Sequence, residues 1–129
     1  MYLHIKAVEA KDVPKMDIIG KSDPFLKFTL NTSSQEYRTK TIKNTLTPQW
    51  HEDIHIPITS NMNDLLHIGL YDEDKFSKND LISTRDFPVS EFRVGEIKDT
   101  WYDFSPIPKL AKKSISGGKV RLIFHLANS

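Results

Sequence analysis

Residues 65–80, LLHIGLYDEDKFSKND, join an apolar run to three aspartates, Asp72, Asp74 and Asp80. The apolar half is typical of a β-strand, in which side chains two positions apart share one face. Asp72 and Asp74 therefore leave the end of the strand on the same face. Asp80 can return beside them after a reversal of the chain through residues 76–79. This stretch predicts a strand that runs into an acidic loop.

A second acidic loop is predicted in residues 16–25, MDIIGKSDPF. Gly20 gives the backbone freedom for a tight turn, and Pro24 starts a strand edge. Asp17 and Asp23 can then point back across one loop. If the fold brings the two acidic clusters together, their like charges destabilise the domain unless a cation neutralises them. Ca²⁺ takes six to eight oxygen ligands in loose geometry, so the pattern predicts a Ca²⁺ site at one end of a β-structure.

Alternation with a period of two dominates the rest of the chain. It predicts eight strands, at residues 2–8, 25–30, 37–42, 50–58, 65–71, 87–89, 100–104 and 119–126. Short strands at this spacing indicate an all-β antiparallel sandwich or barrel. Residues 89–93 predict one helical turn capped by Ser90, and residues 106–116 predict a basic mobile loop. Trp50 is expected to pack in or beside the core.

The bulk properties exclude several classes of protein. A length of 129 residues suits one domain, and 38% hydrophobic with 27% charged residues is ordinary for a globular protein. The net charge of +1 provides no field that would attract nucleic acid. The chain has no cysteine, which excludes disulfides and thiolate chemistry and suits the cytoplasm. No apolar stretch is long enough for a membrane span, so any membrane contact is expected to be peripheral.

Four ordered motifs resemble those of the C2 domain, a family of Ca²⁺-dependent phospholipid-binding modules. They are AKDV at 10–13, GKSDPF at 20–25, NTLTPQWHE at 44–52 and the acidic loop at 71–80, and WYDF at 101–104 fits the family's penultimate strand. The resemblance spans residues 2–126 and implies a single domain over residues 1–129. It implies an eight-stranded antiparallel Greek-key β-sandwich. The order of strands resembles the phospholipase-type (type II) permutation.

The resemblance also implies a set of metal ligands. The family's five ligating aspartates match Asp17, Asp23, Asp72, Asp74 and Asp80, and further oxygens match the carbonyls of Met16 and Glu73 and the hydroxyl of Ser77. Two or three Ca²⁺ ions are expected in such a site. An EF-hand is excluded, because the loop from Asp72 would need Gly in place of Ser77 and Glu in place of Ser83.

Membrane contacts are expected beside the ligands. Apolar side chains at the loop tips predict insertion into the bilayer, or else packing on neighbouring loops: Ile18, Ile19 and Phe76. Neighbouring lysines are expected to meet lipid phosphates: Lys21, Lys75 and Lys78. Basic residues on two predicted strands resemble the family's phosphoinositide site, or form an ordinary solvated face: Lys27, Arg38 and Lys40.

These expectations combine into one predicted function, Ca²⁺-dependent binding to anionic phospholipid membranes, with phosphatidylserine or phosphoinositides as lipid partners. The domain is expected to be cytoplasmic and reversibly peripheral on membranes. A catalytic carboxylate pair is disfavoured because nothing nearby supplies a nucleophile, so no enzymatic activity is predicted. The alternative is a Ca²⁺-independent module that binds proteins or phosphoinositides through the basic residues. Protein partners stay open.

Overall fold

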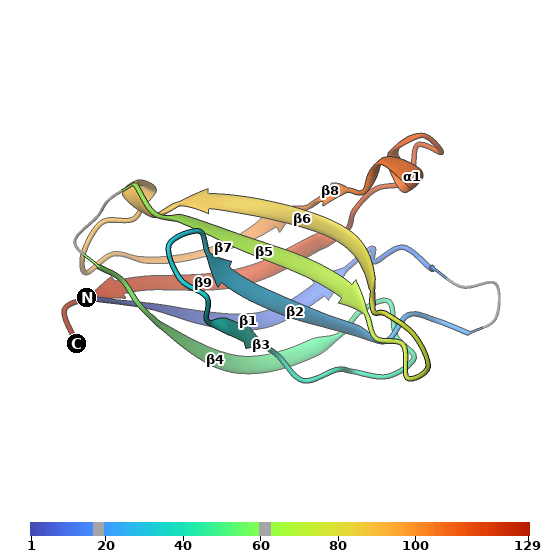
Figure 1. The fold of residues 1–129 in the computed structure, drawn as a ribbon, viewed down its shortest axis with the longest axis horizontal. Coiled ribbons are helices and arrows are strands. Elements are labelled where there is room, and N and C mark those ends of the chain that lie inside the picture. Colours follow the sequence, from blue (N-terminus) through green and yellow to red (C-terminus); the bar gives the residue numbers. More distant parts are fainter. Residues whose placement is uncertain (17–19, 60–62) are drawn as a thin grey trace.

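Two antiparallel sheets face each other as a β-sandwich in the computed structural model, which describes residues 1–16, 20–59 and 63–129 (Figure 1). The first sheet has the order β4-β1-β9-β7, formed by Gln49–Pro57, Tyr2–Lys11, Lys119–Ala127 and Ile97–Asp103. The second has the order β3-β2-β5-β6-β8, formed by Glu36–Arg38, Pro24–Leu30, Leu65–Asp72, Asp80–Pro88 and Ser105–Pro106. The predicted all-β sandwich is confirmed.

The core lies between the sheets and follows the predicted alternation. In β1, Leu3, Ile5 and Ala7 are buried, while the residues between them point outward. β9 alternates in the same way along its whole length. Trp50 is 6% exposed, and its indole N–H donates to the carbonyl of Pro24 at 3.2 Å. The expectation that Trp50 packs in the core is therefore confirmed.

The second sheet differs from the prediction at its edges. β6 begins at Asp80, well before the strand predicted from residue 87. The prediction missed the first half of β6 because the buried polar residue Ser83 interrupts the apolar pattern there. β3 ends at Arg38 rather than continuing to residue 42. The Thr39 hydroxyl accepts from the Leu26 N–H and donates to the Lys40 carbonyl, so a side chain takes over part of the bonding to β2, while the Thr39 N–H still donates to the Leu26 carbonyl at 2.9 Å. β8 adds a short ninth strand.

Helical structure is limited to two short turns in the described residues. The 3₁₀ turn Val89–Glu91 is capped by Pro88 without a side-chain hydrogen bond, so the predicted Ser90 cap is wrong. α1, Pro108–Ala111, lies inside the segment that the sequence predicted as a loop. No helix among these residues has the length and apolar character needed to cross a membrane.

Strand register sets which segments share an end of the sandwich. Lys11 pairs with Lys119 in the first sheet, and Pro24 pairs with Asp72 in the second. The β1–β2, β5–β6 and β8–β9 connections therefore emerge together, at the end we call the loop end (Figure 1). Both termini lie at the opposite end, where Tyr2 pairs with Ala127.

Candidate metal-binding site

Strand pairing brings aspartates from distant parts of the chain to the loop end. Pro24 is opposite Asp72, and Asp72 is opposite Asp80, so the ends of β2, β5 and β6 lie side by side. The Asp23 N–H donates to Asp72 Oδ1 at 2.8 Å, and the Glu73 N–H donates to the Asp23 carbonyl at 3.0 Å. Asp23 and Asp72 are thus held against each other although 49 residues separate them.

These residues line a concavity of about 250 Å³ at the loop end. Its lining residues come from both acidic segments: Asp23, Asp72, Glu73, Asp74, Lys75, Phe76 and Asp80. Four of the five predicted aspartates are therefore brought together. The fifth, Asp17, lies outside the described residues, as do the predicted insertion residues Ile18 and Ile19.

The donor set suits a hard divalent cation, because carboxylate oxygens are the ligands that Ca²⁺ prefers. Within residues 1–16, 20–59 and 63–129, no three carboxylate, histidine or cysteine side chains converge closely enough to hold an ion by themselves. Asp72 and Asp23 carboxylate oxygens instead accept backbone N–H groups. Such charge-assisted hydrogen bonds hold the carboxylates in place and stabilise their negative charge at a crowded site.

Asp74 is oriented by its own loop. The Phe76 N–H donates to Asp74 Oδ1 at 2.9 Å, and the Ser77 hydroxyl donates to Asp74 Oδ2 at 2.8 Å. The Phe76 N–H, and then the Ser77 hydroxyl, lower the pKa of Asp74 below its ordinary value. The side chain is therefore ionised at neutral pH, as a cation ligand must be. Phe76 itself is 97% exposed at the loop tip.

Two asparagines support the site in ways that sequence reasoning missed. The Asn44 N–H donates to Asp23 Oδ1 at 2.6 Å, and Asn44 Oδ1 accepts from the Lys21 N–H at 2.9 Å. Asn79 Oδ1 accepts the Asp74 N–H at 2.9 Å. Asn44 has a φ of 54°, a conformation that asparagine adopts more readily than most residues. Asn79 follows Asp74 by five residues in the same acidic loop, so sequence spacing could have identified it, whereas Asn44 lies 21 residues from Asp23 and gives no local signal.

Most of the other residues predicted to contact metal or lipid lie outside the acidic concavity. Ser77 and Lys21 are exposed, and the Met16 side chain is partly buried against the core. None of these three lines the acidic concavity. Lys75 lines it beside Phe76, and Lys78 lies in the same loop but faces a neighbouring concavity.

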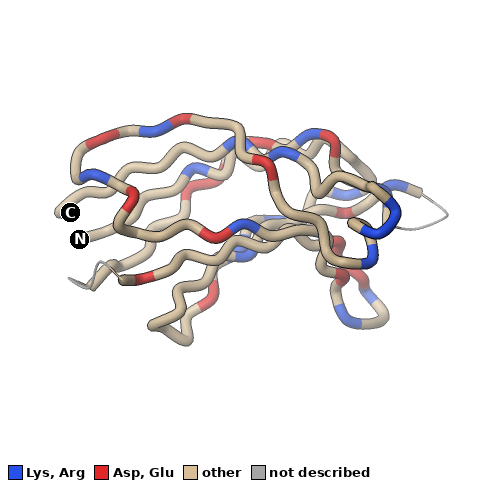
Figure 2. Tube along the Cα trace, turned by 90° about the horizontal axis from the view of Figure 1, so that it is seen from above, with Lys and Arg blue, Asp and Glu red and all other residues tan. Residues whose placement is uncertain are grey.

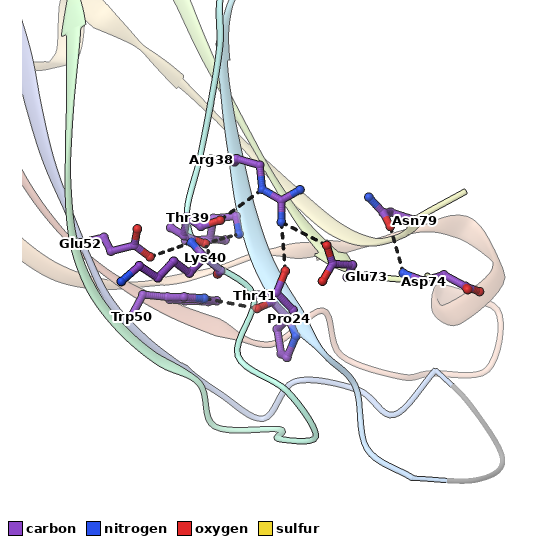
Figure 3. A network of polar contacts seen from close by, with 11 residues as sticks. Pro24, Arg38, Thr39, Lys40, Thr41, Trp50, Glu52, Glu73, Asp74 and Asn79 are labelled. Atoms are coloured by element: carbon purple, nitrogen blue, oxygen red, sulfur yellow. Dashed lines mark hydrogen bonds and ion pairs between the residues drawn. The ribbon is translucent and has the colours of Figure 1, made fainter. Parts of the chain in front are cut away.

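Two of the three residues of the predicted basic strip lie on adjacent strands. Lys27 and Arg38 are paired in register across β2 and β3. Lys40 was expected on the same strand as Arg38, which is wrong because β3 ends at Arg38. Lys40 is exposed in the following connection, where its N–H donates to the Glu52 carboxylate at 2.7 Å (Figure 3).

Lys27 and Arg38 border a second concavity of about 300 Å³, lined by Phe25, Lys27, Glu36, Arg38, Tyr71, Lys78 and Asn79. The Phe25 and Tyr71 rings stack at 5.2 Å between centroids. The Arg38 guanidinium lies 3.7 Å from the Phe25 centroid, and Lys27 Nζ lies 4.8 Å from the Tyr71 centroid. Cations placed over aromatic faces are held in position without losing their charge.

Gly69 makes room for this arrangement. A Cβ at Gly69 would lie 2.7 Å from the Tyr71 ring, so only glycine allows the ring to lie against β5. Arg38 Nη2 also lies 3.6 Å from a Glu73 carboxylate oxygen, which joins the basic concavity to the acidic one (Figure 3). The two concavities are therefore adjacent and share an ion pair.

Comparison with known proteins points to one family. A family model for the C2 domain matches residues 1–104. A C2 and GRAM domain-containing protein of Arabidopsis thaliana is 33% identical over 132 residues, which cover 100% of this chain and 13% of that protein. This chain thus spans a small part of that relative.

Solved structures give the same result for the fold. A structure of one C2 domain of plant Extended Synaptotagmin 1 has a TM-score of 0.84 at 22% identity, covering 96% of this chain and 92% of that one. A calcium-bound structure of two C2 domains of Extended-Synaptotagmin 2 has a TM-score of 0.80 at 25% identity, covering 96% of this chain and 44% of that one.

Proposed function

The chain belongs to the C2 domain family, and from that premise we propose that it binds anionic phospholipid membranes through its acidic loops in a Ca²⁺-dependent way. The observation that carries the proposal is the register of β2, β5 and β6, which gathers Asp23, Asp72 and Asp80 around one concavity with Asp74. We assign no catalytic step to this domain.

The residues of the loop end would act in two layers. Asp23, Asp72, Asp74 and Asp80 form the layer that would hold two or three Ca²⁺ ions, with Asp17 as the fifth carboxylate. Bound Ca²⁺ would neutralise these carboxylates and offer unfilled coordination positions to lipid phosphate or carboxylate oxygens. Lys75 and Phe76 form the outer layer, which faces the headgroups and the apolar boundary.

Without a cation, the acidic layer repels the phosphates of an anionic membrane. Ca²⁺ affinity and membrane affinity must therefore increase together, since linkage between two binding events is reciprocal. Without lipid, the Ca²⁺ dissociation constant is expected on the order of 10–1,000 μM, as in sites with an incomplete ligand set. Ca²⁺ should also raise the midpoint of thermal unfolding, because it binds the folded state alone.

The proposal is tested by co-sedimentation with vesicles that contain about 30% phosphatidylserine, in about 1 mM Ca²⁺ or in chelator. Binding that is much tighter in Ca²⁺ than in chelator supports the proposal. Binding that is equal in both conditions would favour a Ca²⁺-independent module instead. Vesicles of phosphatidylcholine alone serve as the control for lipid charge.

Phe76→Ala should weaken vesicle binding in Ca²⁺ by about tenfold or more, since burial of a phenylalanine side chain is worth about 1.5–3 kcal/mol. The side chain is 97% exposed, so its removal should leave thermal unfolding unchanged. The vesicle concentration at half-maximal binding measures the effect. Ile97→Ala is the matched control, because Ile97 is 67% exposed near the opposite end. Equal effects of both substitutions would exclude insertion of Phe76.

A second candidate function is phosphoinositide binding in the basic concavity. The specific observation is the pair of cations fixed over the stacked Phe25 and Tyr71 rings, with Lys78 at the border. Several phosphates on one headgroup would fit a concavity that offers three cationic side chains. Glu36 lies 3.8 Å from Lys27, and Glu73 lies 3.6 Å from Arg38, so each of these cations would exchange a carboxylate for a phosphate.

The double variant Lys27→Gln/Arg38→Gln should remove the gain in binding that phosphatidylinositol bisphosphate adds to phosphatidylserine vesicles. A loss of about tenfold or more is expected, because two charge-assisted hydrogen bonds are removed. Binding to vesicles of phosphatidylserine alone should change little in comparison. A uniform loss on both kinds of vesicle would indicate a general charge effect and contradict a headgroup site.

A further inference from the structure

A basic segment outside the acidic loops also occupies the loop end. Residues 107–116, which we call the basic lobe, include α1 and carry Lys109, Lys112 and Lys113. No acidic residue occurs between Phe104 and Gly118. The lobe therefore concentrates three positive charges on a chain whose net charge is only +1.

The lobe is a built structure rather than the loop that the sequence predicted. Leu110 is buried at 6% exposure and anchors the turn, and the Ile115 N–H donates back to the Leu110 carbonyl at 3.0 Å. The Ile107 N–H donates to the Ile82 carbonyl at 3.1 Å, which ties the lobe to β6. The Ser83 hydroxyl donates to the Gly117 carbonyl at 2.7 Å and fixes its other end.

The three lysines are free to meet a partner. All three are exposed, and none forms an ion pair with any acidic residue in the described parts of the chain. Some other cations of the domain are paired, as Lys119 is with Asp103 and Arg121 with Asp99. The lobe thus keeps its charge for an external anion.

The position of the lobe selects the kind of anion. Its two ends join β8 to β9, so it emerges at the loop end together with the acidic loops (Figure 1). Seen from above, basic and acidic positions lie together at the end of the molecule opposite the termini (Figure 2). A membrane that meets the acidic loops is a broad surface, and it can meet the lobe at the same time.

The chemistry of the lobe agrees with a broad surface. Its cations are all lysines, which are point charges on flexible stems and lack the fork with which arginine grips a single phosphate. Three such charges suit the diffuse field of an anionic bilayer, where each lysine near the surface adds to the attraction.

We propose that the basic lobe is a second membrane-contact surface, which attracts anionic phospholipid without Ca²⁺ and sets the tilt of the domain when the acidic loops dock. This inference deepens the proposed function and relies on it for the orientation of the bound domain. The lobe acts before Ca²⁺ arrives, because its attraction needs no metal. Its contribution should decline as salt rises, since the screening length is about 10 Å at 0.1 M.

The first test compares two charge-matched double variants, Lys112→Gln/Lys113→Gln in the lobe and Arg93→Gln/Lys98→Gln near the opposite end. Arg93 and Lys98 are also exposed, and they too have no ion pair among the described residues. Binding to phosphatidylserine vesicles is measured at low salt, once in chelator and once in Ca²⁺. Lys112→Gln/Lys113→Gln should reduce binding by about 25-fold both in chelator and in Ca²⁺, at about fivefold per lysine. Arg93→Gln/Lys98→Gln should change it by less than about twofold.

The outcomes separate this inference from the proposed function. Equal losses in the two double variants, or no loss in the lobe variant, would overturn the lobe as a membrane contact and leave the Ca²⁺ response untouched. A wild-type protein that ignores Ca²⁺ would overturn the proposed function, while the comparison in chelator would still test the lobe. If the lobe variant keeps vesicle binding but loses retention on heparin, the lobe serves a soluble polyanion and our proposal fails.

A second measurement reads the position of the lobe directly. The chain has no cysteine, so Ala111→Cys provides a unique attachment point for a fluorophore in α1. Its emission should be quenched by lipids that carry a headgroup-level quencher. A fluorophore at Val94→Cys, where the native side chain is 54% exposed near the opposite end, should be unaffected. Quenching at Val94→Cys but not at Ala111→Cys would overturn the proposal.

Discussion

Asp72→Asn combined with Asp74→Asn is expected to abolish Ca²⁺-dependent vesicle binding and to weaken Ca²⁺ affinity by about 100-fold or more. Ca²⁺ affinity depends on the number of charged ligands over several orders of magnitude, and this variant loses two of the five predicted carboxylates. The side-chain amide keeps an oxygen for the N–H groups of Asp23 and Phe76, so these two backbone contacts are retained. Calorimetric titration with and without phosphatidylserine vesicles measures the loss.

Stability in chelator distinguishes loss of the metal from misfolding. Because the variant removes two like charges from a crowded site, its midpoint of thermal unfolding in chelator should equal or exceed that of the wild type. Ca²⁺ should raise the midpoint of the wild type and leave that of the aspartate variant unchanged. Glu91→Gln/Glu96→Gln removes the same charge from exposed positions distant from the acidic loops and should behave as the wild type. Undiminished Ca²⁺ binding by the aspartate variant would exclude this site.

Gly117→Ala should lower the free energy of unfolding by about 3 kcal/mol, because the added methyl group has no space. A Cβ at this position would lie 2.3 Å from the Phe104 carbonyl oxygen and 2.8 Å from the Pro106 nitrogen. Both are backbone atoms of the segment that leads into the basic lobe, so neither can rotate away. For a domain of this size the midpoint of thermal unfolding should fall by about 10 °C, which circular dichroism measures.

Two companion variants make this prediction specific. Gly95 has a φ of 87° and open space around it, so Gly95→Ala should cost only the backbone strain, about 1 kcal/mol. Ser83→Gly added to Gly117→Ala should not restore stability, since the contact with Phe104 remains. If the unfolding midpoint of Gly117→Ala lies within about 2 °C of that of the wild type, close packing of this segment does not exclude a side chain at position 117.

The sequence predicted the strands whose surroundings are simple. β1, β4 and β9 alternate because one face of each meets the core and the other meets water, and that difference is reflected in residue type. The start of β6 was missed because the buried Ser83 hydroxyl donates to the Gly117 carbonyl, a partner 34 residues away. α1 is a four-residue helix, too short to produce a period of 3.6 residues.

The acidic site was predictable to a similar extent. Spacing within each cluster indicated which aspartates could share a loop, and the register of β2, β5 and β6 brings Asp23 to Asp72 and Asp80. The bond from the Asn44 N–H to Asp23 joins residues 21 apart and depends on a tertiary contact that no local pattern encodes, whereas the bond from the Asp74 N–H to Asn79 lies within one loop. The stack of Phe25 on Tyr71 likewise depends on the open space above Gly69, which becomes visible only in three dimensions.

The pairing of Tyr2 with Ala127 has a practical consequence for the geometry of a docked domain. Both ends of the polypeptide leave from one corner, separated from the proposed membrane-contact tips by roughly the 30 Å rise of a ten-residue strand such as β1. A partner protein or fluorescent reporter fused to either end would extend into solution, away from the bilayer. Even a very short connector would therefore leave the bilayer contact unobstructed.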